Sequence, residues 1–439
     1  MDFKEVCNYI DKTLIFGIKP NLFRISEILN LLDNPEKKVN FIHIVGTNGK
    51  TSVTKITSAI LKEHNLKVGY YISPHIYSYT ERISINGNDI SQIKFTKAFE
   101  EILPLINKVN KMNYGGEMTQ FEILTAMMFY VAYNEKLDVM VMEAGMGGRW
   151  DATNVANAKV VGLTGVSLEH TQILGKTIKE IAKEKAEVIK TKSFVATSSN
   201  DLQVLRILKQ KIKETNSSLY LINKNFFIKD IKKDDFEGFT VDIHGIYDDY
   251  NNIEFPILGD YQKNNLCLAV ALSELFLEKK LDNKKLNQSL KNTKIIGRFQ
   301  IMKREPIFIA DASHNPEGIK NLILNISKYF KNNKKIIIFS VLKDKNYKEM
   351  IKDILNIADL LILTSSQTNR SLSVDELEEE VKKEIKIKKN KNEKVPEIIY
   401  KINDIENSIK YSLNIALKND IICLTGSITN LEFVKPEYF

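Results

Sequence analysis

Residues 43–52 read HIVGTNGKTS, and this stretch decides the fold. The apolar run VNFIHIV (39–45) before it predicts a buried strand, and TSVTKITSAILKEHN (51–65) after it has apolar residues at helical spacing. The strict phosphate-loop pattern GxxxxGK[ST] fails, because Ile44 stands where the first glycine belongs. GTNGKTS still supplies turn glycines, free backbone N–H groups, a helix N-terminus and Lys50. The alternative is an ordinary turn with a surface lysine, but the strand before and the helix after favour phosphate binding.

The organisation of the chain predicts an α/β protein with two domains. Its 439 residues exceed what one core usually serves, and the alternation of strand and helix patterns restarts at about residue 297. We expect a P-loop-containing domain with a mostly parallel sheet at 1–296, followed by a smaller Rossmann-like α/β domain at 297–439. Short strand-like pieces among turns predict a small antiparallel appendage at about 200–258. The basic run at 386–394 predicts a solvated loop.

The composition, 43% hydrophobic and 27% charged, is that of an ordinary soluble globular protein. No apolar run approaches the roughly 20 residues that span a membrane, and the first residues lack the layout of a signal peptide. Cys7, Cys267 and Cys423 are far apart and odd in number, which argues against a disulfide scaffold and predicts a cytoplasmic protein. The net charge of +8 is spread along the chain among acids, which argues against nucleic-acid binding.

Polar side chains follow three predicted strands at the edge that carries the glycine loop. Ser73 ends KVGYYIS, Glu143 ends LDVMVMEA, and Glu169 and His170 follow KVVGLTGVS. Ligands of open α/β sheets gather at this edge, where oxygen ligands suit magnesium and an imidazole could complete a second metal site. Ser73 and His170 could each be a turn or cap residue instead. Glu143 is harder to dismiss, because a carboxylate at the end of a buried strand needs a partner or a cation.

The segment TIKEIAKEKAEVIK (177–190) places Lys185 in the middle of the apolar face of a predicted helix. Burial of an ammonium group is costly and lowers its pKa, which leaves more neutral amine. A neutral amine can react with carbon dioxide to give a carbamate, an anion suited to magnesium. Spacing alone favours the ordinary alternative, in which Lys185 reaches the surface or meets a carboxylate.

Ten motifs in order carry a resemblance that runs over almost the whole chain: HIVGTNGKTS, ISPH, ERISING, TQFEILTA, EAGMGGRWDATN, LEHTQILGKTIKEIAKEKAEVIK, GRFQ, DASHNPEG, VLKDK and LTGS. Together they resemble the folylpolyglutamate synthases, including bifunctional dihydrofolate synthase forms, among the Mur-ligase-like ATP-dependent amide ligases. The resemblance implies that ATP phosphorylates the terminal γ-carboxylate of a folate and that L-glutamate attacks the acyl phosphate. Dihydropteroate stays open as a second acceptor. The implied partners are ATP, two magnesium ions, a reduced folate or dihydropteroate, and L-glutamate, on a monomer.

The resemblance also assigns roles around the glycine loop. It places the ATP phosphates on Thr47, Asn48, Gly49, Lys50, Thr51 and Ser52. It places one magnesium ion on Ser73, which also belongs to the substrate site, and on Glu143. The second ion falls on His170, and the family's lysine at the position of Lys185 is carbamylated. With Arg298, the implied catalytic set is Lys50, Glu143, His170 and Lys185.

Further positions are implied outside the loop. Asn265 matches the asparagine near the adenine, and Arg298 and Asp311 match residues by which the second domain closes on ATP. His314 lies in the same motif as Asp311 and is implied in ATP and glutamate binding. Phe121 lies where the family contacts the pterin, although a packed aromatic residue at a helix start is an equal alternative.

The sequence departs from the family pattern at four places, and none of them removes a proposed ligand. Glu169 stands where aspartate is usual, Glu187 where glycine is common, and Tyr261 where histidine is frequent; DASHN replaces the commoner DGAHN.

Other functions stay open beside the folate ligase. A Mur ligase acting on a UDP-linked peptide is the runner-up, and the motif SPH…ERISING favours the folate branch. A P-loop switch or motor would turn over ATP without a small-molecule product. A catalytically silent nucleotide-binding or nucleic-acid-binding module would show salt-sensitive affinity without ADP release, and the set of polar rim residues argues against it.

Overall fold

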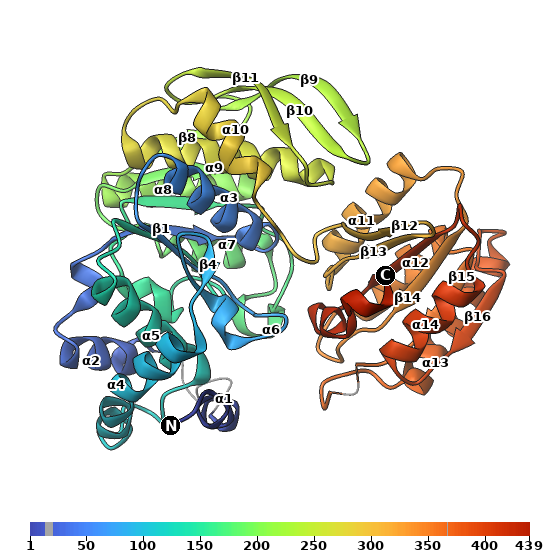
Figure 1. Ribbon diagram of the computed structural model, residues 1–439, viewed down its shortest axis with the longest axis horizontal. Coiled ribbons are helices and arrows are strands. Elements are labelled where there is room, and N and C mark those ends of the chain that lie inside the picture. Colours follow the sequence, from blue (N-terminus) through green and yellow to red (C-terminus); the bar gives the residue numbers. More distant parts are fainter. Residues whose placement is uncertain (14–20, 367) are drawn as a thin grey trace. The chain divides into compact units, whose positions relative to one another are not determined.

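The computed structural model describes residues 1–13, 21–366 and 368–439, which form two compact units. Unit 1 comprises Met1–Lys233, Thr240–Phe255 and Gln262–Thr293, and unit 2 comprises Asp234–Phe239, Pro256–Tyr261 and Lys294–Phe439 (Figure 1). Within the described parts of the chain, no helix has both the length and the apolar character that crossing a membrane requires.

Unit 1 is built on an eight-stranded sheet with the strand order β4-β3-β2-β5-β1-β6-β7-β8. All neighbours from β2 to β8 pair in parallel, and only β3 and β4 at one edge are antiparallel. The prediction of a mostly parallel sheet is therefore confirmed. The strands are β1 (Asn40–Val45), β2 (Val68–Tyr71), β3 (Ile83–Ile85), β4 (Asn88–Asp89), β5 (Val139–Glu143), β6 (Val160–Leu163), β7 (Phe194–Thr197) and β8 (Ser218–Leu221).

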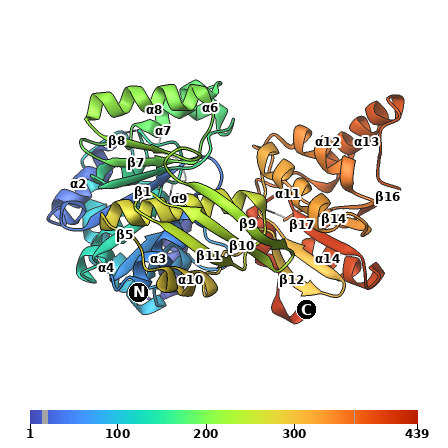
Figure 2. The ribbon, with the colours of Figure 1, turned by 90° about the horizontal axis from the view of Figure 1, so that it is seen from above.

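Helices cover both faces of this sheet, because alternate strand residues point to opposite sides and both sides are apolar. On one face, Phe41 and Met142 belong to a core that includes α4 and α5. On the other, α3 packs on β1, β2 and β5, and Leu272 of α9 contacts Gly162 of β6. Figure 2 shows α8 beside β7 and β8. The helices are α1 (Phe3–Lys12), α2 (Phe23–Leu31), α3 (Lys50–Glu63), α4 (Gln92–Asn110), α5 (Gln120–Asn134), α6 (Thr171–Leu174), α7 (Ile178–Ala186), α8 (Leu202–Thr215), α9 (Asp260–Leu277) and α10 (Asn283–Lys291).

The antiparallel appendage is smaller than the sequence predicts. β9 (Phe227–Asp235), β10 (Gly238–His244) and β11 (Asp249–Phe255) form a separate three-stranded sheet, and their short connections fit antiparallel neighbours. The first part of the predicted range, from residue 200, is wrong: α8 is a helix, and β8 pairs in parallel with β7 as an edge strand of the large sheet. An edge strand that is half exposed has the same short, mixed pattern as a meander strand, so the pattern could not tell them apart.

Unit 2 is a smaller α/β fold with a six-stranded sheet in the order β12-β13-β17-β14-β15-β16. Only β12 is antiparallel to its neighbour. The Rossmann-like second α/β fold is confirmed. Its elements are β12 (Gln300–Arg304), β13 (Ile307–Ala310), α11 (Pro316–Tyr329), β14 (Lys335–Phe339), α12 (Tyr347–Ile357), β15 (Leu360–Leu363), α13 (Val374–Asn390), β16 (Ile398–Lys401), α14 (Ile405–Ile415) and β17 (Ile421–Thr425).

The basic run at 386–394 is not simply a solvated loop. α13 continues through its first half, and Lys388 is only 1% exposed. Its ammonium donates to Asn356 Oδ1 at 2.6 Å and to Glu393 Oε2 at 3.0 Å. The prediction was wrong here because the partner amide comes from α12, which the local charge pattern does not reveal.

Candidate active site

The glycine loop lies between β1 and α3, and only a glycine can occupy its first position, residue 46. Gly46 has φ +150°, and a Cβ there would lie 1.7 Å from Thr164 Oγ1. That hydroxyl donates to the Asn48 carbonyl at 2.7 Å, so the residue after β6 holds the loop. Gly49 has φ +88° and caps α3 without a side-chain acceptor, which leaves the helix N-terminus directed at the rim.

Thr47 and Lys50 have different surroundings in this loop. The Thr47 N–H donates to the Gly165 carbonyl at 2.8 Å, and its hydroxyl accepts from the Ser167 N–H at 3.0 Å. Thr47 therefore ties the loop to the segment after β6. The Lys50 ammonium folds back to the carbonyls of Gly46 (3.2 Å) and Thr47 (3.0 Å), over the loop that would hold phosphates.

The Glu143 carboxylate joins three of the predicted site segments. Glu143 ends β5 and is fully buried. Its Oε2 accepts from the Thr51 hydroxyl at 2.9 Å, and its Oε1 accepts from the backbone N–H of Ser73, just after β2. A carboxylate and two hydroxyl-bearing residues make an oxygen-rich donor set, which fits magnesium.

The other side of the loop is covered by α9. A Cβ at Gly49 would lie 2.7 Å from Asn265 Oδ1, so this side chain lies directly against the loop. The Asn265 amide donates to Gln262 at 2.9 Å, and Gln262 in turn donates to the buried Ser52 hydroxyl at 3.4 Å. The sequence reasoning missed Gln262; a signal was available, because Gln262 and Asn265 are one helical turn apart.

Lys185 is buried at the loop, and among the described residues it neither reaches the surface nor forms an ion pair with a carboxylate, the two arrangements that spacing alone favoured. It is 4% exposed, and its ammonium donates to the Gly46 carbonyl at 2.7 Å. Burial, and to a smaller extent the charge of Lys50, lower the pKa of Lys185 to about 7, and the carboxylates of Glu169 and Asp151 oppose this shift. The structure therefore brings α7 to the same loop as Lys50.

His170 is the N-cap residue of the short helix α6, with φ +50°, a left-handed conformation. Its Nε2 lies 3.9 Å from Glu169 Oε1. The charge of Glu169 raises the pKa of Lys185, so the segment that carries Glu169 and His170 lies close enough to act on a residue of the glycine-loop site. Among the described residues, no three His, Cys, Asp or Glu side chains converge in a manner that could bind a metal ion by themselves.

The glycine-rich segment after β5 is held by Asp151, which the sequence reasoning did not single out. This buried carboxylate accepts from the N–H groups of Met146 (2.8 Å) and Thr153 (3.0 Å), and burial raises its pKa. The segment passes close to two neighbours. A Cβ at Gly148 would lie 2.5 Å from a carbonyl of α7, and the half-buried Phe121 ring packs on Gly145.

The three predicted residues of unit 2 lie close together within that unit. The buried Asp311 carboxylate accepts from the N–H groups of Phe299 (2.8 Å) and Ser313 (2.9 Å). Arg298 donates to the Gly297 carbonyl at 3.2 Å, and His314 Nδ1 lies 2.9 Å from the Ala312 carbonyl. The roles of these residues in binding stay predictions.

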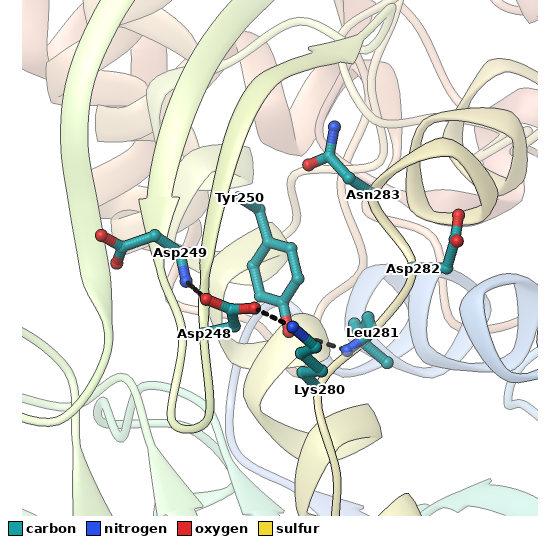
Figure 3. Close-up of a pocket in the computed structure, with 7 residues that line it drawn as sticks. All are labelled: Asp248, Asp249, Tyr250, Lys280, Leu281, Asp282 and Asn283. Carbon is teal, nitrogen blue, oxygen red and sulfur yellow. Dashed lines mark hydrogen bonds and ion pairs between the residues drawn. The ribbon is translucent and has the colours of Figure 1, made fainter.

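A pocket of about 410 Å³ in unit 1 contains none of the predicted site residues (Figure 3). It carries three aspartates, one of which pairs with Lys280 at 3.2 Å. Such a lining repels phosphate and does not compete with the glycine loop as a nucleotide site. The lining residues are Asp248, Asp249, Tyr250, Lys280, Leu281, Asp282 and Asn283.

The parallel sheet, the glycine loop at its carboxyl edge and the buried carboxylate beside it define a nucleotide-binding α/β protein of the P-loop class. Residues 44–273 match the Mur ligase middle domain, and residues 297–428 match the Mur ligase glutamate ligase domain.

Named relatives identify the family. A dihydrofolate synthase/folylpolyglutamate synthase of Bacillus subtilis is 30% identical over 432 residues, which cover 93% of this chain and 99% of that protein. A protein of the same name from Mycobacterium tuberculosis is 32% identical over 82% of this chain and 77% of its own length. The solved structure of M. tuberculosis folylpolyglutamate synthase complexed with ADP superposes with a TM-score of 0.92 at 28% identity, over 99% of this chain and 98% of that chain. The chain belongs to the dihydrofolate synthase/folylpolyglutamate synthase family.

Proposed function

We propose that this chain is an ATP-dependent ligase that joins L-glutamate to the γ-carboxylate of a reduced folate or folylpolyglutamate. The observation that carries the proposal is the buried Glu143 carboxylate, which accepts hydrogen bonds from the Thr51 hydroxyl of the glycine loop and from the backbone N–H of Ser73, just after β2. Support also comes from the family and from the ADP complex of the M. tuberculosis relative. Dihydropteroate, with a single carboxylate, is the second acceptor that we propose to test.

The charges around the glycine loop fit a phosphoryl transfer to a carboxylate. Two unit negative charges 4 Å apart repel by about 4 kcal/mol at an effective dielectric of 20. Lys50 and the N-terminus of α3 oppose this repulsion at the loop. The γ-phosphoryl group passes to the acceptor carboxylate and leaves ADP. The glutamate nitrogen then attacks the acyl carbon, inorganic phosphate leaves, and the nitrogen loses a proton.

We propose two magnesium ions in this unit, which when bound would neutralise phosphate charge. Ser73 and Glu143, with the Thr51 hydroxyl beside them, would hold the first ion. His170 and a carbamylated Lys185 would hold the second. Buried Lys185 with its lowered pKa supports this assignment. After exchange with ¹³C-bicarbonate, active enzyme should show a labelled carbamate carbon that is absent from Lys185→Arg; an unmodified amine in fully active enzyme would refute it.

We also propose a cytoplasmic monomer that acts on small molecules only. Its three cysteines are free, which suits a reducing compartment. Light scattering at working concentration measures the mass, and a stable dimer would contradict this part of the proposal.

The test of the function is glutamate-dependent release of ADP. Wild-type protein with ATP and magnesium should form ADP only when both L-glutamate and an acceptor are present, and the product should gain one glutamyl residue by mass. Tetrahydrofolate and dihydropteroate are compared as acceptors in parallel. Turnover of ATP without glutamate would favour a switch or motor, and turnover with a UDP-linked peptide instead of folate would favour the Mur-type alternative.

Glu143→Ala tests whether the carboxylate at the end of β5 takes part in the reaction. Removal of the carboxylate should lower turnover by at least about 100-fold, because loss of one such electrostatic group typically costs this much. Circular dichroism should stay unchanged. Near-normal turnover would remove Glu143 from the reaction.

A further inference from the structure

Arg82 is a buried cation without an acidic partner. It is 7% exposed and ends the 3-10 helix η2 (Tyr79–Arg82), between β2 and β3. Among the described residues, no carboxylate forms an ion pair with it. In the same unit, the charge of the buried Arg24 is balanced in the usual way, by an ion pair between its guanidinium and the Glu122 carboxylate at 3.1 Å. A buried charge normally needs such a partner, so Arg82 calls for an explanation.

The contacts of Arg82 leave most of its donors available. Its Nε donates to His75 Nδ1 at 2.9 Å, and its guanidinium lies 5.6 Å from the centre of the Tyr79 ring. Neither terminal nitrogen has a hydrogen-bond partner among the described residues, and neither is fully enclosed, so both reach the surface. The face of the guanidinium is therefore occupied and its terminal edge is open.

The hydrogen bond to Arg82 also fixes the proton on His75. An arginine can only donate, so the Nδ1 atom of His75 must accept, and the neutral ring carries its proton on Nε2. The imidazole is itself held against the Tyr79 ring, with 4.3 Å between the ring centres. Arg82 and His75 thus form one rigid group of N–H donors with a net positive charge, which suits a carboxylate.

Arg82 is joined to the end of β2, next to a residue that contacts Glu143. The Arg82 carbonyl accepts from the Ile72 N–H at 3.0 Å, one residue before Ser73, whose N–H binds Glu143. The buried Tyr71 phenol lies within reach of the charges of both Arg82 and Glu143. The centre of the Tyr71 ring lies 5.9 Å from the centre of the Phe121 ring.

We propose that Arg82, positioned with His75, binds a carboxylate of the acceptor substrate. The inference rests on the proposed ligase function, because that function supplies an acceptor with a carboxylate next to the phosphate rim. A folate ends in a glutamate with two carboxylates, the reacting γ-carboxylate and the α-carboxylate, and either could be the ligand. The buried charge is then balanced when the acceptor is bound, and an acceptor without the carboxylate is rejected because the cation would stay unpaired.

The experiment measures steady-state kinetics of Arg82→Met with tetrahydrofolate. The apparent KM for tetrahydrofolate should rise about 10- to 100-fold, since hydrogen bonds to a charged group are worth this much. The KM for L-glutamate and the affinity for ADP should stay within about twofold. The control is Lys55→Met, which removes a cation 5.5 Å from the Tyr70 ring, on the opposite face of β2, and should leave all three constants unchanged.

His75 gives an independent readout if Arg82→Met does not fold. His75→Leu removes the donor and should raise the acceptor KM, whereas His75→Gln keeps an N–H donor and should restore most of the affinity. An unchanged acceptor KM in both Arg82→Met and His75→Leu, or a rise in the KM for L-glutamate alone, would overturn the proposal. So would equal loss in His75→Gln and His75→Leu, since a purely structural role would not distinguish them.

The α-carboxamide analogue of tetrahydrofolate separates the two carboxylates. If Arg82 binds the α-carboxylate, the analogue should lose affinity for wild-type protein, and Arg82→Met should add no further loss. If Arg82 binds the reacting γ-carboxylate, the loss of affinity caused by the analogue and the loss caused by Arg82→Met should multiply. The measurements on wild-type protein test the proposed function separately. If the wild type shows no glutamate-dependent turnover of tetrahydrofolate, the proposed function is refuted, and the proposed role of Arg82 is refuted with it.

Discussion

At the residue scale, three buried charged residues of unit 1 are each stabilised differently: Glu143 and Lys185 at the glycine loop, and Arg82 between β2 and β3. Glu143 accepts from a hydroxyl and a backbone N–H, and Lys185 donates to a carbonyl and has a lowered pKa. Arg82 has a neutral imidazole as its hydrogen-bond partner. These charges cost stability in the free protein, and they are already oriented when substrates arrive. Such preorganisation is what makes electrostatic groups effective in a reaction.

The same unit contains a buried histidine whose titration should limit stability in acid. His43 on β1 is fully buried, and burial lowers its pKa to about 3. The unfolded chain binds a proton at about pH 6.5 and the folded chain does not, so stability falls as the pH drops from 6.5 towards 3. At pH 5 this loss is about 2 kcal/mol.

His43→Gln should therefore reduce the acid sensitivity of folding. The free energy of unfolding, from urea titrations at pH 7.5 and pH 5, should differ by about 2 kcal/mol less in the variant than in the wild type. The quantity to compare is the difference in unfolding free energy between the two pH values. The absolute stability is no guide, because the substitution also lowers stability at every pH by disturbing the hydrogen bond between His43 and Thr153 (2.8 Å). If the unfolding free energy changed equally with pH in the wild type and in His43→Gln, His43 would be accessible to protons in the folded chain.

At the element scale, the position of α7 depends on the glycine-rich segment after β5. A Cβ on Gly148 would lie 2.5 Å from the Glu184 carbonyl and 2.9 Å from the Cα of Lys185. Both are backbone atoms, so they can move only with the helix. Gly148→Ala should displace α7, cost about 1–3 kcal/mol of stability, and lower turnover by moving Lys185 from the loop.

The control for this prediction is Gly87→Ala. Gly87 has φ +80° in the turn between β3 and β4, and its nearest neighbour would be the Lys62 ammonium at 4.0 Å. The substitution strains the backbone without contact to α7, so it should lower the free energy of unfolding while turnover of the folded fraction stays normal. Equal effects of the two variants on turnover would contradict the role of α7.

The elements also show which features the sequence could predict. β1, α3 and the buried end of β5 follow from local apolar periods. One charge on an apolar helix face singled out Lys185, but spacing alone favoured a lysine that reaches the surface or meets a carboxylate. β8 was assigned to the wrong sheet and Lys388 to solvent, because strand partners and distant amides do not appear in a local pattern. The pairing of Arg82 with His75 was missed for the same reason.

At the scale of the whole molecule, the chain divides its predicted binding residues between two units. The glycine loop, Glu143 and Lys185 belong to unit 1, and Arg298 and Asp311 belong to unit 2. Both units match Mur ligase models, and the relatives extend over nearly the full chain. A ligase that needs both units should lose turnover, but not its nucleotide affinity, when unit 2 alone is altered.

Arg298→Ala tests this division. The glycine loop, which we propose binds the phosphates, lies wholly within unit 1, so ADP affinity, measured by calorimetry, should stay within a few-fold of the wild type. Turnover should fall about 100- to 1000-fold, because a positive charge that opposes developing charge contributes chiefly to the rate. The matched control is Arg304→Ala, an exposed arginine of the same unit that lies 3.8 Å from Glu237 and should have little effect. If Arg298→Ala retained full turnover, or if ADP affinity fell as steeply as the rate, the proposed catalytic role of unit 2 would be refuted.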